Sequence, residues 1–308
     1  MSSRPSRREF VAAALAAGLA APLARAIEPI KRSGKAKLTP SLAGYSFNRY
    51  MNLKSKAKPT MTLEDFIDLC AKLELPATEL TAYYFPKTDG EYLKSIKKRC
   101  DDHKLAVSGT AIGNDFCWPE EEKQKEQLEH VKAWVEHSAA LGAKTMRIFA
   151  GTVKKGDKEE DARKRAVELI EKACEHAARH KIYLALENHG GITATSEQLL
   201  AIVKAVKSDW FGVNLDTGNF RTKDPYADME KAAPYAVVVQ MKTEVFYEQQ
   251  AKDKDKKTYK REEASFEKKT KLLREAKFQG YVALEYEAAE DPKTAVPKYV
   301  KELKKYCD

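Results

Sequence analysis

Eight short apolar segments alternate with amphipathic segments, and this alternation constrains the fold more than any other feature of the chain. The strand-like segments are LAGYSF (42–47), ATELT (77–81), AVSGTAIG (106–113), TMRIFAG (145–151), YLALENH (183–189), FGVNLDT (211–217), AVVVQMKTE (236–244) and YVALEYEA (281–288). Segments between them, such as 62–73, 126–143 and 161–180, carry apolar residues at helical spacing. Because parallel strands need long crossover connections, usually helices, the alternation indicates parallel βαβ units.

The number of these units favours a closed barrel. Eight βαβ units over roughly 250 residues match a (β/α)₈ TIM barrel. An open doubly wound sheet is the competing fold, but no GxGxxG follows the first apolar run, so its usual dinucleotide-binding signature is missing. We therefore predict an α/β protein with a single TIM-barrel domain, the catalytic domain, over residues 38–308.

The N-terminus has the pattern of an export signal. The twin arginine in SRREF (6–10) precedes the apolar run VAAALAAGLAAPLA, and ARA (24–26) follows it. This order predicts a Tat-type signal peptide over 1–26 and a linker over 27–37, although a chance basic amphipathic helix is the alternative. The apolar run is shorter than the roughly 20 residues of a membrane span, so we expect no stable membrane insertion. The predicted partner is the Tat machinery, and the predicted location is periplasmic or secreted.

The basic net charge does not by itself indicate nucleic-acid binding. Of the formal net charge of +9, the first 26 residues supply +3 from four arginines and one glutamate, which leaves +6 for the remainder. Much of that remainder lies in AKDKDKKTYKR (251–261), whose dense charge predicts a solvated loop. A single basic loop serves solubility more often than recognition, so we expect no nucleic-acid partner.

Polar residues stand at the ends of most predicted strands, where barrel enzymes keep their active sites. They are Glu79, Arg147, Glu187, Asn188, His189, Asp216, Gln240, Lys242, Glu244, Glu285 and Glu287. Side chains alternate along a strand, so Glu187 shares a face with Ala185, and Glu285 shares one with Ala283. Bulky apolar residues occupy the opposite faces, as expected for strands that pack outward on helices. The acidic residues are therefore predicted to point into the barrel.

Converging carboxylates repel one another and need a compensating cation. For any one of them, a salt bridge to Arg147 or Lys242 is the alternative to a metal. Three carboxylates on nearby strands, with Gln240 between them, favour a metal instead. These ligands would be Glu187, Asp216, Gln240 and Glu285. Carboxylate and amide oxygens are hard donors, which suit Mn²⁺ or Mg²⁺ better than Zn²⁺.

Only one histidine follows a strand end. Five of the six lie in helical segments, whereas His189 follows the fifth predicted strand. We predict that His189 binds a substrate hydroxyl or transfers a proton, with loop capping as the alternative.

Four motifs resemble the sugar phosphate isomerase/epimerase superfamily, the xylose isomerase-like TIM barrels, over residues 38–305. They are ALENHGG, NLDTGN, QMKTE and ALEYE. The resemblance implies one divalent metal bound by Glu, Asp, His and Glu of the last four strands, here Glu187, Asp216, Gln240 and Glu285. It also implies that Glu187 and Glu285 act as acid and base on opposite faces of a substrate carbon. The Tat-type signal is similar to that of the secreted branch of this superfamily.

Two positions depart from the family pattern. Gln240 stands where the family keeps a metal-binding histidine, and Asn219 replaces the histidine of DTxH. Both changes argue against zinc and against the trinuclear endonuclease IV branch, and they leave the substrate unassigned. Some relatives act on 3-keto-glycosides by β-elimination, which begins with the same proton abstraction.

We therefore expect a divalent-metal-dependent isomerase or epimerase that removes a proton next to the carbonyl of a sugar or glycoside and forms an enediolate. The catalytic residues would be Glu187 and Glu285. The substrate-binding residues would be Glu79, Arg147, His189, Asn219 and Lys242. Aromatic residues after the second and third strands could stack on a sugar ring or fill the core: Tyr83, Tyr84, Phe85, Phe116 and Trp118. The alternatives are a β-eliminating lyase or hydrolase acting on glycosides, and a non-catalytic periplasmic sugar-binding protein.

Overall fold

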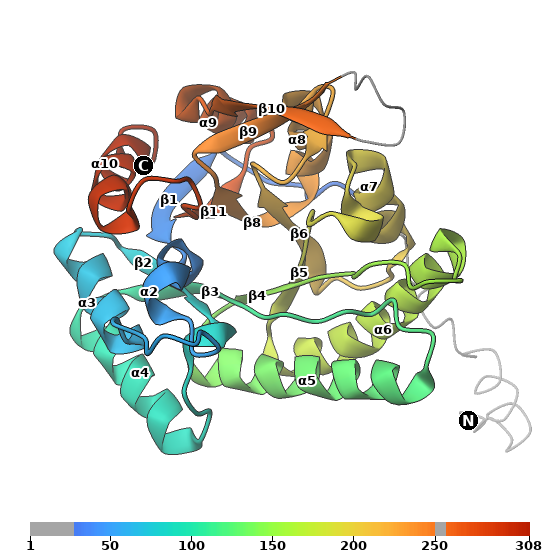
Figure 1. The fold of residues 1–308 in the computed structure, drawn as a ribbon, viewed down its shortest axis with the longest axis horizontal. Coiled ribbons are helices and arrows are strands. Elements are labelled where there is room, and N and C mark those ends of the chain that lie inside the picture. Colours follow the sequence, from blue (N-terminus) through green and yellow to red (C-terminus); the bar gives the residue numbers. More distant parts are fainter. Residues whose placement is uncertain (1–27, 250–256) are drawn as a thin grey trace, which may run out of the picture.

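Eight parallel strands form the central barrel of the computed structural model, which describes residues 28–249 and 257–308. The strands are β1 (Lys37–Leu42), β2 (Ala77–Thr81), β3 (Ala106–Ala111), β4 (Thr145–Ile148), β5 (Tyr183–Glu187), β6 (Phe211–Asp216), β8 (Ala236–Met241) and β11 (Gln279–Leu284). Their order is β1-β11-β8-β6-β5-β4-β3-β2, and a parallel bridge between Ala43 and Glu79 joins the two ends of this sheet (Figure 1). The predicted single-domain (β/α)₈ barrel is confirmed.

Helices surround the barrel on its outside (Figure 1). They are α2 (Asn48–Met51), α3 (Leu63–Lys72), α4 (Gly90–Asp102), α5 (Glu121–Ala140), α6 (Glu159–His180), α7 (Ser196–Ala205), α8 (Pro225–Ala232), α9 (Phe266–Glu275) and α10 (Pro292–Lys304), with the 3₁₀ turns η1 (Gly44–Phe47), η2 (Ala82–Tyr84), η3 (Gly191–Thr193) and η4 (Ala233–Tyr235). Local sequence explains their starts. Thr62 and Asp65 form a capping box at the start of α3, and Pro292 follows the capping residue Asp291 at the start of α10.

The apolar core lies between the helices and the outer face of the barrel. In β5, Leu184 and Leu186 are fully buried on the face opposite to Glu187. Helix α6 buries residues three or four positions apart, including Ala166, Ile170 and Ala173. This spacing places one apolar stripe of the helix against the strands, and it leaves the inner face of each strand end free for polar side chains.

The first strand begins five residues earlier than the sequence pattern predicts. The prediction of a strand over 42–47 is wrong, because β1 is Lys37–Leu42 and the 3₁₀ turn η1 follows it. Pro40 lies inside β1, where it cannot donate a main-chain hydrogen bond. It is tolerated because β1 pairs along its full length only with β11 and reaches β2 through a single bridge.

A second, three-stranded sheet was not predicted, and its strands come from both sides of β8 in the sequence. It is built from β7 (Arg221–Thr222), β9 (Glu244–Gln249) and β10 (Thr258–Glu263), in the order β10-β9-β7. The predicted solvated loop over 251–261 is therefore wrong for residues 258–261, and residues 250–256 lie outside the described residues. Strand β10 has no apolar face, and cross-strand charge pairs such as Arg261 with Glu244 at 3.5 Å replace it.

The predicted signal peptide over 1–26 lies outside the described residues. Residues 28–36 of the predicted linker form neither helix nor strand, and they run along the barrel. The N–H of Ile30 donates to the carbonyl of Pro234 at 3.0 Å, and Gln279 donates to the carbonyls of Ser33 and Lys35. Within 28–249 and 257–308, none of the helices has the length and apolar character that crossing a membrane requires.

Candidate functional site

A cavity of about 270 Å³ opens at the carboxyl ends of the barrel strands. Six of the residues predicted to be catalytic, metal-binding or substrate-binding line it: Arg147, Glu187, His189, Asn219, Lys242 and Glu285. They come from the ends of β4, β5, β6, β8 and β11, or from the residues directly after them. In a parallel barrel all strand ends of one polarity meet at one mouth, which explains why residues far apart in sequence converge here.

Glu187 ends β5 with its carboxylate held from two sides. The Nε of Arg147 lies 3.0 Å from one carboxylate oxygen, and the side-chain amide of Asn219 donates to the other at 2.9 Å. Arg147 also donates to the carbonyl of Ile112 at 2.7 Å, which fixes the guanidinium. Burial raises the pKa of the Glu187 carboxyl well above its ordinary value, while the charge of Arg147 acts in the opposite direction.

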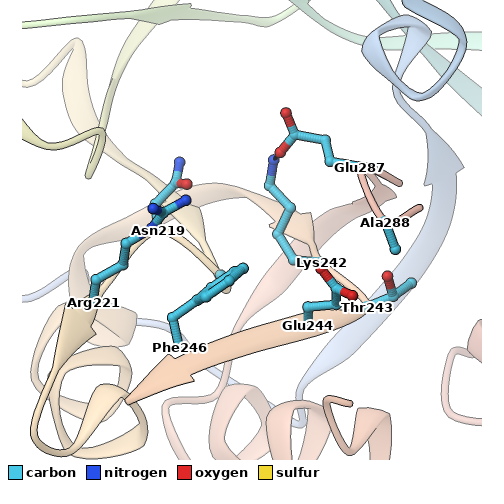
Figure 2. Close-up of a pocket in the computed structure, with 9 residues that line it drawn as sticks. Asn219, Arg221, Lys242, Thr243, Glu244, Phe246, Glu287 and Ala288 are labelled. Atoms are coloured by element: carbon cyan, nitrogen blue, oxygen red, sulfur yellow. Dashed lines mark hydrogen bonds and ion pairs between the residues drawn. The ribbon is translucent and has the colours of Figure 1, made fainter. Parts of the chain in front are cut away.

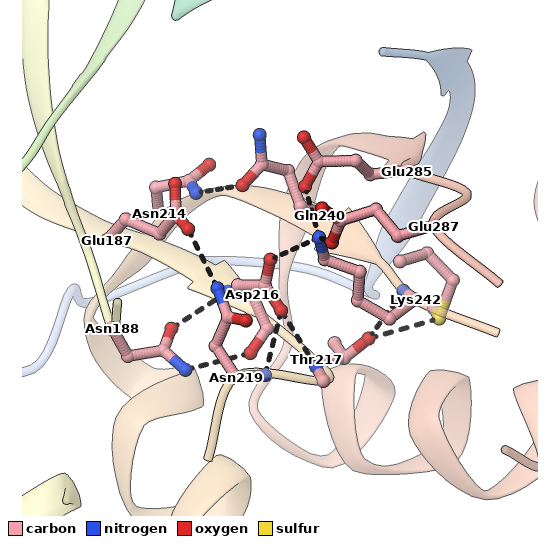
Figure 3. A network of polar contacts seen from close by, with 12 residues as sticks. Glu187, Asn188, Asn214, Asp216, Thr217, Asn219, Gln240, Lys242, Glu285 and Glu287 are labelled. Carbon is pink, nitrogen blue, oxygen red and sulfur yellow. Dashed lines mark hydrogen bonds and ion pairs between the residues drawn. The ribbon is translucent and has the colours of Figure 1, made fainter. Parts of the chain in front are cut away.

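Asp216 ends β6 and is completely buried. Its Oδ1 accepts the N–H groups of Gly218 at 2.8 Å and Asn219 at 3.0 Å, as Figure 3 shows. Its Oδ2 faces the ammonium of Lys242 at 3.3 Å and accepts no hydrogen bond from the described residues. Burial raises the pKa of Asp216 to about 7. The strand end is held in place by Asn188, which exchanges two hydrogen bonds of 2.9 Å with the Asp216 main chain.

Lys242 is the cation at the centre of the remaining carboxylates. Its Nζ lies 2.8 Å from Glu285 and 3.3 Å from Asp216, and it also contacts Glu287 (Figure 3). Burial alone lowers the pKa of Lys242, but these carboxylates raise it well above its ordinary value. The lysine therefore stays charged at neutral pH and holds three acidic side chains together.

Gln240 and Glu79 form a buried pair beside these charges. The side-chain oxygen of Gln240 accepts from Asn214 at 2.6 Å, and its amide nitrogen donates to Glu79 at 3.1 Å. Burial raises the pKa of Glu79 to about 7, with the charge of Glu285 acting in the same direction. Neither Glu79 nor Gln240 is part of the cavity wall in the described part of the chain. The oxygen that was predicted to ligate a metal thus already has a hydrogen-bond donor.

His189 lies on the cavity wall, where the sequence places it. Its ring packs against Phe149 with a centroid separation of 4.4 Å, and Phe149 in turn lies under the Arg147 guanidinium at 4.1 Å. The main-chain N–H of His189 donates to Thr193 at 3.0 Å. Burial lowers the pKa of His189, and so do the charges of Arg147 and Lys242. A neutral imidazole here can exchange hydrogen bonds with a substrate hydroxyl.

Of the five aromatic residues predicted near the site, Tyr83 lines the cavity. Tyr84, Phe85 and Phe116 are buried core residues, and Lys154 covers the ring of Trp118 at 4.0 Å.

The wall contains further residues that the sequence analysis did not assign to the site, namely Tyr45, Phe149 and Arg221. Phe149 could have been found from strand parity, because it lies two residues after Arg147. Arg221 has no such signal, since it belongs to the unpredicted second sheet.

A model of the Xylose isomerase-like TIM barrel family matches residues 67–306, which include all of the strand ends described above except that of β1. The chain belongs to this family. The family part of the predicted resemblance is confirmed. The predicted secreted branch depends on residues outside the described part of the chain and stays a prediction.

Solved structures of several other proteins superpose on the chain. One is a D-psicose 3-epimerase in the presence of D-fructose, with 15% identity, a TM-score of 0.65, and coverage of 87% of this chain and 96% of that chain. Another is IolI with a binding zinc atom, with 19% identity, a TM-score of 0.65, and coverage of 88% and 96%. A third is the 3-keto-D-glucoside 4-epimerase YcjR from E. coli, with 15% identity, a TM-score of 0.63, and coverage of 88% and 100%. At these identities the likeness shows the shared fold. None of the curated proteins compared with the chain matches it.

The charge balance of the xylose isomerase-like site fits a divalent cation. Four buried carboxylates (Glu79, Glu187, Asp216 and Glu285) face two buried cations, Arg147 and Lys242. With all four ionised, the carboxylates exceed these cations by two charges, and the raised pKa values of Glu79, Glu187 and Asp216 reflect how unfavourable that state is without a further cation. Asp216 Oδ2 also has no hydrogen-bond donor among the described residues. Such a set of hard oxygen donors suits a hard divalent cation. To bind one, the carboxylates would have to draw together, and the Gln240 oxygen would use the lone pair that its hydrogen bond from Asn214 leaves free.

A different group of metal-ligand side chains lies on the outer helices. Glu136 of α5 and His176 and His180 of α6 are the one set of three within the described residues whose ligand atoms all lie within 4.8 Å of one another. His176 Nε2 lies 3.2 Å from Glu136, and Arg179 donates to His176 Nδ1 at 3.0 Å. Since these residues are on helices outside the barrel, they take no part in the chemistry of the mouth.

Proposed function

We propose that the protein is an isomerase or epimerase that removes the proton next to a carbonyl group of a sugar. One observation carries this proposal: Glu187 and Glu285 line the same cavity, and each carboxylate is paired with a buried cation. Two carboxylates at one substrate carbon supply a base and an acid, and the two cations supply positive charge where an oxyanion develops.

Different residues of the mouth have different roles in this reaction. One carboxylate takes the proton from the carbon, and the electron pair moves onto the carbonyl oxygen, which gives an enediolate. Lys242, held between Asp216 and Glu285, lies where it can balance this oxyanion charge. The second carboxyl, in its protonated form, returns a proton to the carbon. Return on the opposite face inverts the carbon and gives an epimer.

Arg147 and Asn219 orient Glu187 through their contacts of 3.0 and 2.9 Å, so the carboxylate cannot turn away from the cavity. We further propose that Arg147, His189, Asn219 and Lys242 bind substrate oxygens, because all four line the cavity. For Glu79, which contacts Gln240 and lies off the cavity wall, we propose that it orients Gln240 instead of binding a hydroxyl.

We also propose a divalent metal, Mn²⁺ or Mg²⁺, held by Glu187, Asp216 and Glu285, with the Gln240 oxygen as the weakest donor. A bound ion of this kind polarises the carbonyl of the substrate and lowers the energy of its enolate form. The excess of carboxylates over cations in the mouth supports this assignment.

The reaction is tested by deuterium exchange. The full chain, supplied with Mn²⁺ or Mg²⁺, is incubated with keto-sugars and 3-keto-glycosides in D₂O, and exchange is followed by NMR. Deuterium uptake without bond cleavage is the expected result, and Glu187→Gln and Glu285→Gln should each slow it by about 10²–10⁴-fold. The same change at Glu168, which is exposed on α6, is the matched control and should leave the rate unchanged.

Two outcomes would replace the proposal. Release of the aglycone from a 3-keto-glycoside would identify the β-eliminating lyase or hydrolase. Sugar binding that survives both substitutions, with no exchange in the wild type, would identify a non-catalytic binding protein. Elemental analysis of the purified protein that finds no stoichiometric divalent ion would contradict the metal assignment and leave the exchange result standing.

We propose that the protein is exported through the Tat pathway and acts in the periplasm or outside the cell. The twin arginine, Arg7 and Arg8, and the Ala-x-Ala end of segment 1–26 support this. Phosphorylated sugars are scarce outside the cytoplasm, so a free sugar or glycoside fits this location. Fusion of residues 1–26 to a reporter, with and without Arg7→Lys and Arg8→Lys, tests it by cell fractionation. Equal export of both fusions would contradict the Tat route.

A further inference from the structure

A second cavity of about 230 Å³ adjoins the one that holds the carboxylates. Asn219, Arg221, Lys242 and Glu287 line both cavities. The far wall of the second cavity includes Phe246 of β9 (Figure 2). Because four residues border both spaces, the two cavities are neighbouring parts of one mouth, separated by the Lys242–Glu287 ion pair.

Part of the wall of the second cavity, namely Arg221, Glu244 and Phe246, belongs to the three-stranded sheet, which lies outside the barrel sheet. In the register of this sheet, Arg221 of β7 pairs with Phe246 of β9. The guanidinium carbon of Arg221 lies 4.5 Å from the centroid of the Phe246 ring, and this contact fixes both side chains. In Figure 2 the ring projects from β9 towards the space between Asn219 and Lys242.

The main chain also approaches closely at the border of the two cavities. A Cβ atom at Gly218 would lie 2.6 Å from Cγ and 2.7 Å from Cβ of Lys242. Any larger residue at 218 would therefore push Lys242 away from its carboxylates. The glycine allows the loop after β6 to pass directly beside the lysine, so the second cavity begins where the proposed reaction centre ends.

We propose that the second cavity is a subsite for a second ring of the substrate, which makes the substrate a glycoside in place of a free monosaccharide. This inference rests on the proposed function. Small-molecule sites usually have volumes of about 300–1,000 Å³, and each cavity alone falls below this range whereas the two together fall within it. The Phe246 ring offers an apolar surface to a sugar or aryl ring, and Asn219, Arg221 and Glu244 offer polar groups around it.

The arrangement of the two cavities also indicates where the glycosidic bond between the two rings would lie. Lys242 and Glu287 border both cavities, so the glycosidic oxygen passes beside their ion pair when one ring lies in each space. A third cavity of about 180 Å³, lined by Arg49 and Tyr286 among others, shares Tyr45 and Glu287 with the first but not Lys242. The second cavity is therefore the better continuation of the reaction centre.

The subsite is tested with two probes that share one ring, methyl and p-nitrophenyl 3-keto-β-D-glucopyranoside. Their affinities for the full chain are measured by isothermal titration calorimetry. We expect the p-nitrophenyl glycoside to bind about tenfold more tightly, since one aromatic contact contributes on this scale. Phe246→Ala should bring the ratio of the two affinities to about one, and Phe246→Tyr should restore it. Thermal unfolding of both variants shows whether each is folded.

Arg49→Ala, which changes the third cavity, should keep the tenfold ratio. Equal affinities in the wild type, a ratio unchanged by Phe246→Ala, loss of the ratio in Arg49→Ala, or no binding of either probe would each overturn the subsite. Deuterium exchange separates this result from the reaction. A preference for the aryl glycoside without deuterium exchange supports the subsite and refutes the proposed reaction. Deuterium exchange without any preference supports the proposed reaction and refutes the subsite.

Discussion

Removal of the Arg147 guanidinium tests whether the buried ion pair with Glu187 holds this side of the mouth. Arg147→Met keeps the apolar length of the side chain and removes its charge. Arg147 is 4% exposed and Glu187 is 3% exposed, so water from the cavity replaces only part of the interactions of the lost cation. The substitution also removes the donor to the carbonyl of Ile112.

The expected loss can be estimated from the geometry. At the 3.0 Å separation of the pair, and with an effective dielectric constant of about 20, the attraction is about 5.5 kcal/mol. Removal of one partner of a buried ion pair typically lowers the free energy of unfolding by about 3–5 kcal/mol, because the other charge stays buried without a partner. We therefore expect Arg147→Met to lower the free energy of unfolding by about 3–5 kcal/mol at pH 7. Urea denaturation followed by circular dichroism measures this change.

The double variant shows whether the loss comes from the stranded carboxylate. Arg147→Met with Glu187→Gln removes both charges, so it should be about 2 kcal/mol more stable than Arg147→Met alone. The control is Lys164→Met, which breaks an exposed pair with Glu160 at 2.9 Å on α6 and should cost less than about 1 kcal/mol. A loss below about 1 kcal/mol for Arg147→Met, or a double variant less stable than Arg147→Met, would refute the reasoning.

The pH dependence of this loss has a definite sign. Without Arg147, the pKa of Glu187 in the folded state rises further above its unfolded value, because the charge that opposed the effect of burial is gone. The folded variant then binds more protons than the unfolded chain between these two pKa values, and its stability falls as pH rises through that window. Below the raised folded-state pKa that Glu187 has in the wild type, both proteins bind the same number of protons, so the deficit relative to the wild type should grow only as pH rises above that pKa.

Two further substitutions test neighbouring groups. Gln240→His places an imidazole nitrogen where the amide oxygen lies, and it should raise the affinity for Zn²⁺ about tenfold or more while that for Mg²⁺ changes little, as measured by calorimetry. An unchanged zinc affinity would show that position 240 is not a ligand. Burial lowers the pKa of Lys269 to about 7, so between about pH 7 and 10 the unfolded chain binds more protons and the wild type gains stability as pH rises. Lys269→Met should be more stable than the wild type at pH 7. The gain in the free energy of unfolding is at most about 5 kcal/mol, and the loss of the hydrogen bond to the Lys242 carbonyl reduces it. This gain should disappear near pH 10, and a gain independent of pH would contradict the assignment.

Local patterns predict the barrel and the direction of its acidic side chains. The period of two along each strand places Glu187, Asp216 and Glu285 on the inner face, and parallel strands deliver their ends to one mouth. Both facts depend on neighbouring residues along the chain, so a single sequence contains them. The same parity rule, applied after Arg147, also points to Phe149.

Which cation meets which carboxylate is decided by the tertiary structure. Gln240 contacts Glu79 across 161 positions of sequence, and Lys242 reaches Asp216 and Glu285 from a different strand. These pairings depend on strand register and on side-chain conformation across the barrel, which no local pattern encodes. The sheet that carries Phe246 and the second cavity is decided in the same way, because its charged strand has no apolar periodicity and is held by cross-strand partners. Local patterns along the chain are enough to bring acidic groups to one barrel mouth, whereas contacts between distant segments select their partners and form the cavity beside them.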